Sequence, residues 1–270
     1  MKHYKRVLTI AGSDPSGGAG IQADLKTFSA CGCFGASAIV AVVDENTVGV
    51  TGVHAVPVSF VTGQIKSVLD DIGADAIKIG MLFSSELIRA VKATLAGYPT
   101  IGNIVLDPVM VATSGDVLLQ EDAIETLISE LVPFVRIITP NIPEAEILCG
   151  HPINSQQELD ACAKELSFGR KVSVLLKAGH LKDAELTDVL YNAETDEILS
   201  FRSQRIATNN THGTGCTLSS AIAAFLAHGN SLNVSVRKAT TYIHDAIAAG
   251  SAYQIGHGNG PVHHFFQFWG

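Results

Sequence analysis

The chain has 270 residues, of which 47% are hydrophobic and 16% charged, and its net charge is −8. This length and apolar content allow a large globular core, and no apolar run reaches the length of a membrane span. The negative charge argues against nucleic acid as a partner, because phosphate backbones require a basic surface. The stretch before the first loop is too short and wrongly flanked for a secretion signal, so we expect a cytoplasmic protein.

Predicted strands and helices alternate along the chain with short connections. We expect strands at residues 6–10, 36–43, 75–81, 103–108, 136–140 and 171–177, and a hairpin from 188–191 and 198–201. Helices are expected at 21–28, 57–71, 84–96, 121–131, from 143, at 155–166, and from 213 and 232. Such alternation predicts a single α/β domain over residues 1–270, with a mostly parallel sheet and helices on both faces.

Ligand sites in such folds lie beyond the carboxyl ends of the strands. Six residues lie at or just beyond the ends of predicted strands, so we expect them to share one rim: Gly12, Glu45, Gly80, Asp107, Asn141 and Lys177. The loop at residues 11–20 is rich in glycine and joins a strand to a helix, a place where ligands often bind. An ordinary mobile surface loop is the equally open alternative.

A second glycine-rich stretch, Asn-Asn-Thr-His-Gly-Thr-Gly-Cys-Thr at residues 209–217, precedes an apolar helix. Glycines permit close approach of a ligand, and the first helical N–H groups lack partners and favour negative charge. The residues from Gly213 to Cys216 therefore predict an anion hole suited to a phosphoryl group, with an ordinary turn as the alternative. Neither a Walker A loop nor the dinucleotide fingerprint occurs. Cys216 lies in the first turn, so we expect a lowered pKa for its thiol.

Acidic side chains at the same rim suit a hard cation. Asp107 follows one strand, and Asn141 and Glu144 follow the next, so Mg²⁺ held partly through phosphate is a consistent interpretation. Capping of a turn or a helix start by these residues is the alternative. Lys177 ends a buried strand and can neutralise phosphates there, or it can be a solvated strand end. His212 precedes the anion loop, and we do not assign it as a base.

The five cysteines do not form a recognisable framework: Cys31, Cys33, Cys149, Cys162 and Cys216. Their number is odd and their spacing scattered, so neither disulfides nor a zinc site is expected. From the residues alone, we interpret the chain as a doubly wound enzyme that handles a phosphorylated ligand with Mg²⁺.

Several segments resemble the hydroxymethylpyrimidine/phosphomethylpyrimidine kinases of thiamine synthesis, within the ribokinase-like fold. The similarity runs through nearly the whole chain, in order, at residues 11–27, 78–81, 107–110, 114–116, 139–146, 211–217 and 256–262. It implies a three-layer α/β/α fold and ATP- and Mg²⁺-dependent phosphorylation of 4-amino-5-hydroxymethyl-2-methylpyrimidine, first to the monophosphate and then to the diphosphate. A homodimer is implied as well.

The resemblance also implies roles for individual residues. The loop of Gly213, Thr214 and Gly215 matches the family's anion hole, and Cys216 stands where the wider ribokinase group carries an aspartate base. The implied ATP contacts are Lys177, Thr211 and Gly213, and the implied metal ligands are Asp107 and Glu144. The implied substrate pocket comprises Gly12, Asp24, Glu45, Gly80 and Val109.

Two residues depart from the family pattern. Glu45 stands where the family usually carries a glutamine that binds the aminopyrimidine at two points. A glutamate can do so only if it, or the ring nitrogen, is protonated, and both possibilities remain open from the sequence. Thr113 stands where the family often has lysine.

Three alternatives follow from these residues. A pyridoxal or pyridoxine kinase is the first, because Glu45 can also hold a pyridine nitrogen or a phenol. A non-catalytic sensor is the second, but it would not need Asp107, Glu144, Lys177 and Cys216 together. A sugar kinase of the same fold fits less well, because those enzymes carry aspartate at the position of Cys216.

Overall fold

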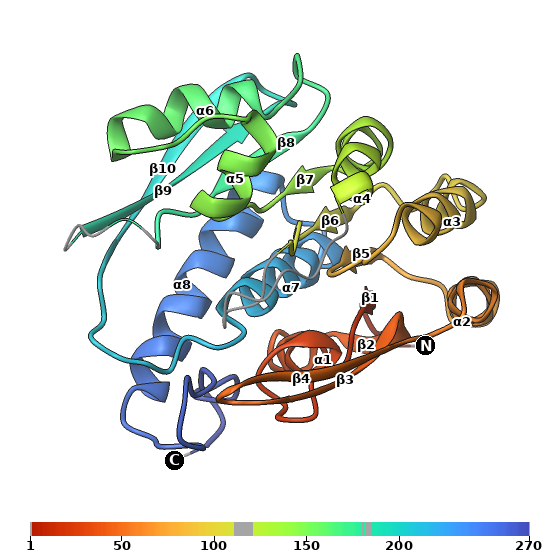
Figure 1. The fold of residues 1–270 in the computed structure, drawn as a ribbon, viewed down its shortest axis with the longest axis horizontal. Coiled ribbons are helices and arrows are strands. Elements are labelled where there is room, and N and C mark those ends of the chain that lie inside the picture. Colours follow the sequence, from red (N-terminus) through yellow and green to blue (C-terminus); the bar gives the residue numbers. More distant parts are fainter. Residues whose placement is uncertain (1, 111–120, 180, 182–184, 270) are drawn as a thin grey trace.

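The computed structural model describes residues 2–110, 121–179, 181 and 185–269 (Figure 1). Its centre is an eight-stranded sheet in the order β10-β9-β8-β7-β6-β5-β1-β2. The six strands from β8 to β2 run parallel, and β9 is antiparallel to both of its neighbours. The bounds are β1 Arg6–Ala11, β2 Phe34–Ile39, β5 Ala76–Ile79, β6 Ile104–Leu106, β7 Ile137–Ile138, β8 Ser173–Leu176, β9 Glu185–Asn192 and β10 Glu197–Gln204.

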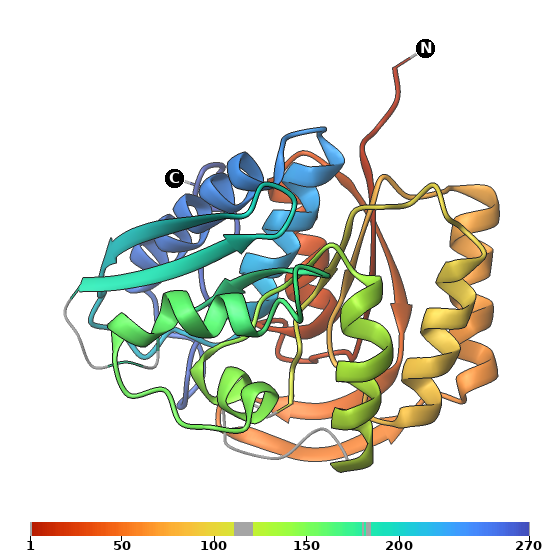
Figure 2. The same ribbon diagram turned by 90° about the horizontal axis from the view of Figure 1, so that it is seen from above.

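Helices cover both faces of this sheet, as the alternating pattern predicted (Figures 1 and 2). One apolar core lies under α2 (Val58–Asp71), α3 (Ser85–Ala96), α4 (Glu121–Thr126), α5 (Ile142–Cys149) and α6 (Leu159–Glu165). The second core lies under α1 (Gly20–Ala30), α7 (Thr214–Ala227) and α8 (Leu232–Gly250). A π-helical turn, Leu127–Leu131, and short 3-10 turns, Val132–Phe134 and Gln156–Glu158, extend or precede α4 and α6.

Residues 36–43 do not form the single strand that their apolar run predicted. The run is divided at Val40 into β2 and β3 (Ala41–Asn46), and β3 pairs with β4 (Gly49–Ala55) in a separate antiparallel hairpin. The break occurs because the end of β1 binds both sides of it: Val40 N donates to Ala11 O (3.0 Å), and Ser13 N donates to Ala41 O (2.9 Å). The polar residues 44–46 consequently extend β3, and Glu45 lies within a strand rather than after one.

Several predicted helix starts have the expected local chemistry. The Ser84 side chain caps α3 by accepting from Leu87 N (3.3 Å). Asn141 and Glu144 form a reciprocal capping box at the start of α5, with Pro143 in the first turn. No helix in the described part of the chain is both long and apolar enough to cross a membrane.

Candidate active site

A cavity of about 1200 Å³ lies beyond the carboxyl ends of the parallel strands. Its wall includes all six residues predicted to share the rim, which confirms that grouping: Gly12, Glu45, Gly80, Asp107, Asn141 and Lys177. Thr211, Val109, Glu144 and the first residues of α7 line the same cavity. Thr113 and residues 114–116, which the family resemblance included, lie outside the described residues.

The first turn of α7 forms one wall of the cavity. Gly213 precedes the helix with φ +74°, the left-handed region that favours glycine. A Cβ at this position would overlap the backbone carbonyl of Gly18, so the close packing of the two glycine-rich loops also requires glycine. The N–H groups of Gly215 and Cys216 belong to the first turn, where helical geometry provides no acceptor. This arrangement has the features of the predicted anion hole.

Lys177 and Asp107 form an ion pair beside this turn. Lys177 Nζ lies 3.1 Å from Asp107 Oδ1. Both groups lie next to Gly215: a Cβ added to this glycine would be 3.3 Å from Lys177 Nζ. Burial opposes ionisation of Asp107, but Lys177 and Lys78, with a hydrogen bond from Thr139, hold its pKa below the usual range. A fixed cation therefore faces the place where the helix terminus favours an anion.

Glu144 is buried near the same pair, at 4% exposure. Its carboxylate accepts from Asn141 N (2.8 Å), so the capping role considered as the alternative is present. Burial and the nearby charge of Asp107 raise the pKa of Glu144 to about 7, although Lys177 acts in the opposite direction. The negative charges of Asp107 and Glu144 repel each other in this buried position. A divalent cation bound between them would offset that repulsion.

Asp24 does not line the cavity, contrary to the pocket position that its motif implied. The carboxylate is fully buried below the cavity wall, where it accepts from Lys78 Nζ (2.9 Å to each oxygen), Thr9 Oγ1 (2.6 Å) and Ser220 Oγ (2.7 Å). Lys78 lines the cavity in its place. A contact from Asp24 to a bound ligand would therefore have to pass through Lys78.

The expected lowering of the Cys216 pKa is wrong for the free protein. Burial raises the pKa of this thiol to about 11, with Asp24 and Asp107 adding to the effect and Lys78 opposing it. Desolvation of a thiolate thus outweighs the field of the helix terminus here. Ser220, one turn further along α7, donates to Asp24, so the Lys78–Asp24 pair packs against the helix face that carries Cys216.

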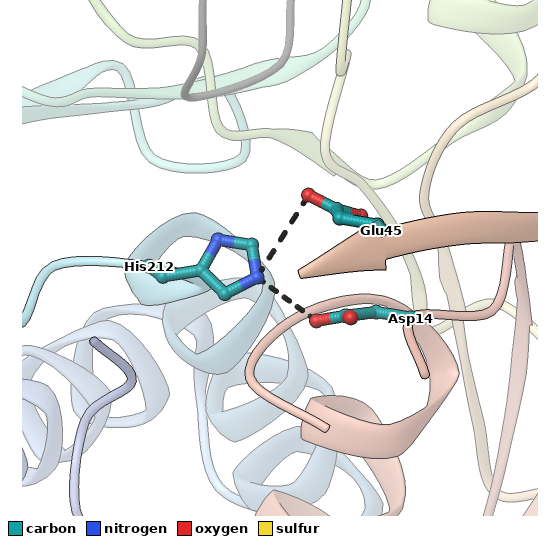
Figure 3. Close-up of side chains that lie close together, drawn as sticks. All are labelled: Asp14, Glu45 and His212. Atoms are coloured by element: carbon teal, nitrogen blue, oxygen red, sulfur yellow. Dashed lines mark hydrogen bonds and ion pairs between the residues drawn. The ribbon is translucent and has the colours of Figure 1, made fainter. Parts of the chain in front are cut away.

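A third cluster, Asp14, His212 and Glu45, lies at another part of the cavity wall (Figure 3). His212 Nε2 lies 2.9 Å from Asp14 Oδ2 and 3.9 Å from Glu45 Oε1. Burial opposes both charges. Hydrogen bonds from His212, Ser16 and Ala19 nevertheless hold the pKa of Asp14 well below its usual range, and Asp14 and Glu45 raise the pKa of His212. The cluster therefore favours the charged form of His212 beside the Asp14 carboxylate.

Sequence reasoning did not find the roles of Asp14, His212 and Lys78. Each lies within a motif that was singled out, at residues 11–20, 209–217 and 78–81, but the partners are distant in the chain. Asp14 and His212 are separated by 198 positions, and Lys78 and Asp24 by 54. The available signal was the presence of ionisable residues inside two glycine-rich loops.

Comparison with known proteins agrees with this geometry. Residues 14–263 match the family model described as phosphomethylpyrimidine kinase. The chain belongs to the phosphomethylpyrimidine kinase family. Relatives named hydroxymethylpyrimidine/phosphomethylpyrimidine kinase are 47% identical in Rhizobium meliloti, over 97% of each chain, and 46% identical in Escherichia coli, over 97% of this chain and 98% of the relative. Like them, the protein is a phosphotransferase.

Solved structures of the same fold include kinases for two vitamins. Phosphomethylpyrimidine kinase from Clostridium difficile is 41% identical, with a TM-score of 0.78 over 90% of this chain and 99% of that one. Pyridoxal kinase from Staphylococcus aureus, solved with AMP-PCP and pyridoxal, is 32% identical, with a TM-score of 0.87 over 99% of this chain and 96% of that one. These likenesses confirm the predicted ribokinase-like α/β architecture and support the use of ATP.

Proposed function

We propose that the protein uses ATP to phosphorylate 4-amino-5-hydroxymethyl-2-methylpyrimidine and then its monophosphate, yielding the diphosphate used for thiamine synthesis. The observation that carries the proposal is the position of Cys216 at the amino end of α7, in one cavity with Lys177. An acceptor hydroxyl beside Cys216 would meet a phosphoryl group held by the helix terminus. The names of the relatives supply the substrate, and residues 1–270 are proposed to act as a single kinase domain.

The two parts of the cavity wall divide the work. The N–H groups of the Gly213–Cys216 turn, including those of Thr214 and Gly215, bind the phosphoryl group during its transfer. Lys177 binds the ATP phosphates. Thr211 and Gly213 border the nucleotide. The heterocycle occupies the part of the cavity lined by Gly12, Glu45, Gly80 and Val109.

Mg²⁺ is the proposed metal, and the oxygen-rich donor set of Asp107 and Glu144 fits it. Bound there, the ion would neutralise charge on the ATP phosphates. Glu144 carries a pKa near 7 in the free protein, so it can lose its proton near neutral pH when a cation is available. Thr139 orients the Asp107 carboxylate by donating to Oδ1 (3.0 Å).

The reaction joins the substrate hydroxyl oxygen to the γ-phosphorus, breaks the bond from that phosphorus to the ADP oxygen, and passes the hydroxyl proton to the Cys216 sulfur. Burial keeps this thiol protonated at neutral pH in the free protein. Cys216 can accept the hydroxyl proton only after the thiol has lost its own proton to solvent. Lys78 and Lys177 supply positive charge on the cavity wall that would stabilise the resulting thiolate.

A cytoplasmic homodimer acting on small molecules fits the remaining observations. The described cysteines are all free thiols, as a reducing compartment favours. The β3–β4 hairpin exposes Val42, Val48 and Val53, a group that a second copy of the chain would cover. The net charge of −8 suits neither nucleic acid nor an anionic membrane surface as a partner.

A second candidate substrate is pyridoxal, because pyridoxal kinases from two bacteria have the same fold at TM-scores of 0.86 and 0.87. Their identity to this chain is 32–33%, against 46–47% for the pyrimidine kinases. The pyrimidine is therefore the preferred assignment.

The test is conversion of the pyrimidine by purified protein with ATP and Mg²⁺, followed by mass spectrometry. We expect the monophosphate to appear first and the diphosphate to follow. Omitting Mg²⁺ should abolish both products. A native protein that binds the pyrimidine without forming either product would instead be the non-catalytic sensor.

A further inference from the structure

Residues 256–261, with the sequence Gly-His-Gly-Asn-Gly-Pro, form a segment that the proposed function does not use. The segment belongs to the stretches that resemble the kinase family, yet none of its residues lines the cavity. Its first four residues are exposed, so burial in a core does not account for it either. This segment, the strap, connects the β3–β4 hairpin to the loop that precedes α7.

One end of the strap is attached to Thr47, in the turn between β3 and β4 (Figure 1). The backbone N–H groups of His257 and Gly258 both donate to Thr47 Oγ1, at 3.2 Å each, and Asn259 N donates to Thr47 O (2.8 Å). Gly258 has no room for a side chain, because a Cβ there would overlap the Thr47 carbonyl. Three successive N–H groups of the strap thus converge on one threonine.

The other end of the strap is attached to the loop that leads into the proposed anion hole. His212 N donates to Gly260 O (3.0 Å), and the next residue, Gly213, begins the turn around the phosphoryl site. Asn210 packs so closely against Gly260 that a Cβ on this glycine would overlap Asn210 Oδ1. Asn210 Nδ2 in turn donates to Gly250 O (2.8 Å), at the end of α8. This end of the strap is consequently fixed close to the anion hole.

The hairpin depends on such attachments because it lies outside the central sheet. Among the described strands, β3 and β4 pair with each other in a separate two-stranded sheet, and an isolated hairpin is only marginally stable in water. Its base is bound to the segment at the end of β1 through Ala11 and Ser13. Val43 and Val50 place the hairpin in the wall of the cavity. The position of that wall therefore depends on how the turn is held as well as on the base.

We propose that Thr47 is a positioning residue for the reaction: by binding the strap, it holds the β3–β4 hairpin in place relative to the Gly213–Cys216 turn. This role rests on the proposed function, because the hairpin lines the part of the cavity assigned to the heterocycle. Without the Thr47 hydroxyl, the hairpin would occupy its binding-competent position only part of the time. The apparent affinity for the pyrimidine would fall by that fraction, whereas a bound pyrimidine would restore the position and the turnover number at saturation.

The nucleotide part of the site provides an internal reference. The proposed ATP contacts, Lys177, Thr211 and Gly213, come from the end of β8 and the loop before α7, and not from the hairpin. The strap also stays attached to that loop when only the turn of the hairpin is changed. Loosening the hairpin should therefore leave the nucleotide affinity unchanged, whereas a general loss of folding would weaken the binding of both ligands.

The test compares Thr47→Val, which keeps the shape of the side chain but removes the hydroxyl, with Thr47→Ser, which keeps the hydroxyl. In calorimetric binding of the pyrimidine without ATP, we expect Kd to rise about tenfold in Thr47→Val, as two lost hydrogen bonds allow, and to stay native in Thr47→Ser. The Kd of AMP-PCP and the turnover number at saturating pyrimidine should be unchanged in both variants. Thr51→Val is the matched control, because the Thr51 hydroxyl donates to Asp44 O (3.1 Å) within the hairpin itself.

Hydrogen–deuterium exchange of the free proteins reports on the hairpin directly. Amides of residues 41–55 should exchange faster in Thr47→Val than in the native protein, Thr47→Ser or Thr51→Val. Gly258→Ala approaches the same contact from the strap, because its Cβ would push the strap away from the Thr47 carbonyl. This variant should also raise the Kd of the pyrimidine and speed exchange in the hairpin.

Several outcomes would overturn the role of Thr47. These are a native pyrimidine Kd in Thr47→Val, equal rises in the Kd of the pyrimidine and of AMP-PCP, or a Thr47→Ser variant as weak as Thr47→Val. Faster exchange with a native pyrimidine Kd would make Thr47 a structural residue only. In each case, conversion of the pyrimidine by the native protein leaves the proposed function standing. A native protein that neither binds nor converts the pyrimidine would remove the proposed function and the role of Thr47 together.

Discussion

The two ends of the cavity carry charge in different ways. At the phosphate end, Lys78 and Lys177 are each paired with an aspartate, and Lys78 and Asp24 have no exposed surface. At the end lined by Asp14, Glu45 and His212, the ring end, His212 lies close to both carboxyl groups, and Asp14 accepts from the backbone N–H groups of Gly18 and Ala19. The phosphate end therefore holds its lysines in ion pairs beside the proposed anion hole, whereas the ring end presents His212 and Glu45 to the cavity.

The largest expected effect comes from removing the proposed base at the phosphate end. Cys216→Ala should lower the turnover number about 10²–10⁴-fold, the usual contribution of a general base, while the affinity for the pyrimidine stays unchanged. Steady-state kinetics and calorimetric binding measure the two quantities. Cys149→Ala is the matched control, because Cys149 ends α5 outside the cavity. An unchanged turnover number in Cys216→Ala would show that Cys216 is not the base.

Breaking the buried pair below the phosphate end should mainly affect stability. Lys78→Met leaves the Asp24 carboxylate buried without its cation, which costs about 3–5 kcal/mol of unfolding free energy. Urea denaturation measures the loss. The double variant Lys78→Met with Asp24→Asn removes both charges and should recover most of it. Equal losses in the single and double variants would mean that the two side chains stabilise the fold by packing and not by their charges.

Gly213 tests how tightly the two glycine-rich loops must pack. Gly213→Ala imposes a left-handed backbone on alanine and also a clash with the Gly18 carbonyl, so we expect a loss of at least about 1–3 kcal/mol together with lower activity. Gly229→Ala is the control: its φ is +84°, but a Cβ there would meet nothing within 4 Å. The same cost and full activity in both variants would contradict a role for the close approach.

The ring end should show a smaller, pH-dependent contribution from His212. Its folded-state pKa is raised above 6.5, so its stabilising charge is fully present below pH 6.5 and is lost as pH rises through the folded value. The free energy of unfolding should therefore fall as pH increases above 6.5, by up to about 1.4 kcal/mol per unit of pKa shift. His212→Asn should remove that slope in urea titrations.

His264 provides the opposite case within the same molecule. Burial lowers its pKa to about 3, and the neutral ring lies 3.1 Å from Thr217 Oγ1 on α7. A depressed pKa means that stability is lost as pH falls below 6.5, so His264→Gln should flatten the acid side of the profile and leave the alkaline side unchanged. If both histidine variants altered the same limb, the opposite charge assignments of His212 and His264 would be wrong.

Much of the architecture was predictable because it depends on local patterns. Alternating apolar strands and amphipathic helices predicted the layers, and the carboxyl ends of parallel strands brought Gly80, Asp107 and Lys177 together as expected. The start of α7 after Gly213 and the Ser84 cap were also predictable from short-range chemistry. These features need no knowledge of contacts between distant segments.

What the sequence did not reveal depends on such distant contacts. The break at Val40 arises from hydrogen bonds to Ala11 and Ser13, about thirty positions away, and no local signal marks it. The helix terminus alone suggested an acidic thiol at Cys216, but desolvation in the folded protein reverses the direction of the shift. Asp24 was expected in the pocket wall. It lies below the cavity wall instead, because its carboxylate is paired with Lys78, which lines the cavity.

In the proposed function, the ring end binds an aminopyrimidine and the phosphate end phosphorylates it. The most direct measurement is a competition in which the purified protein, ATP and Mg²⁺ meet equal concentrations of hydroxymethylpyrimidine and pyridoxal in one tube, with phosphorylated products followed by mass. We expect pyrimidine products to accumulate first and to reach the diphosphate. Preferential formation of pyridoxal phosphate would contradict it and would show that Glu45 directs the cavity toward pyridines.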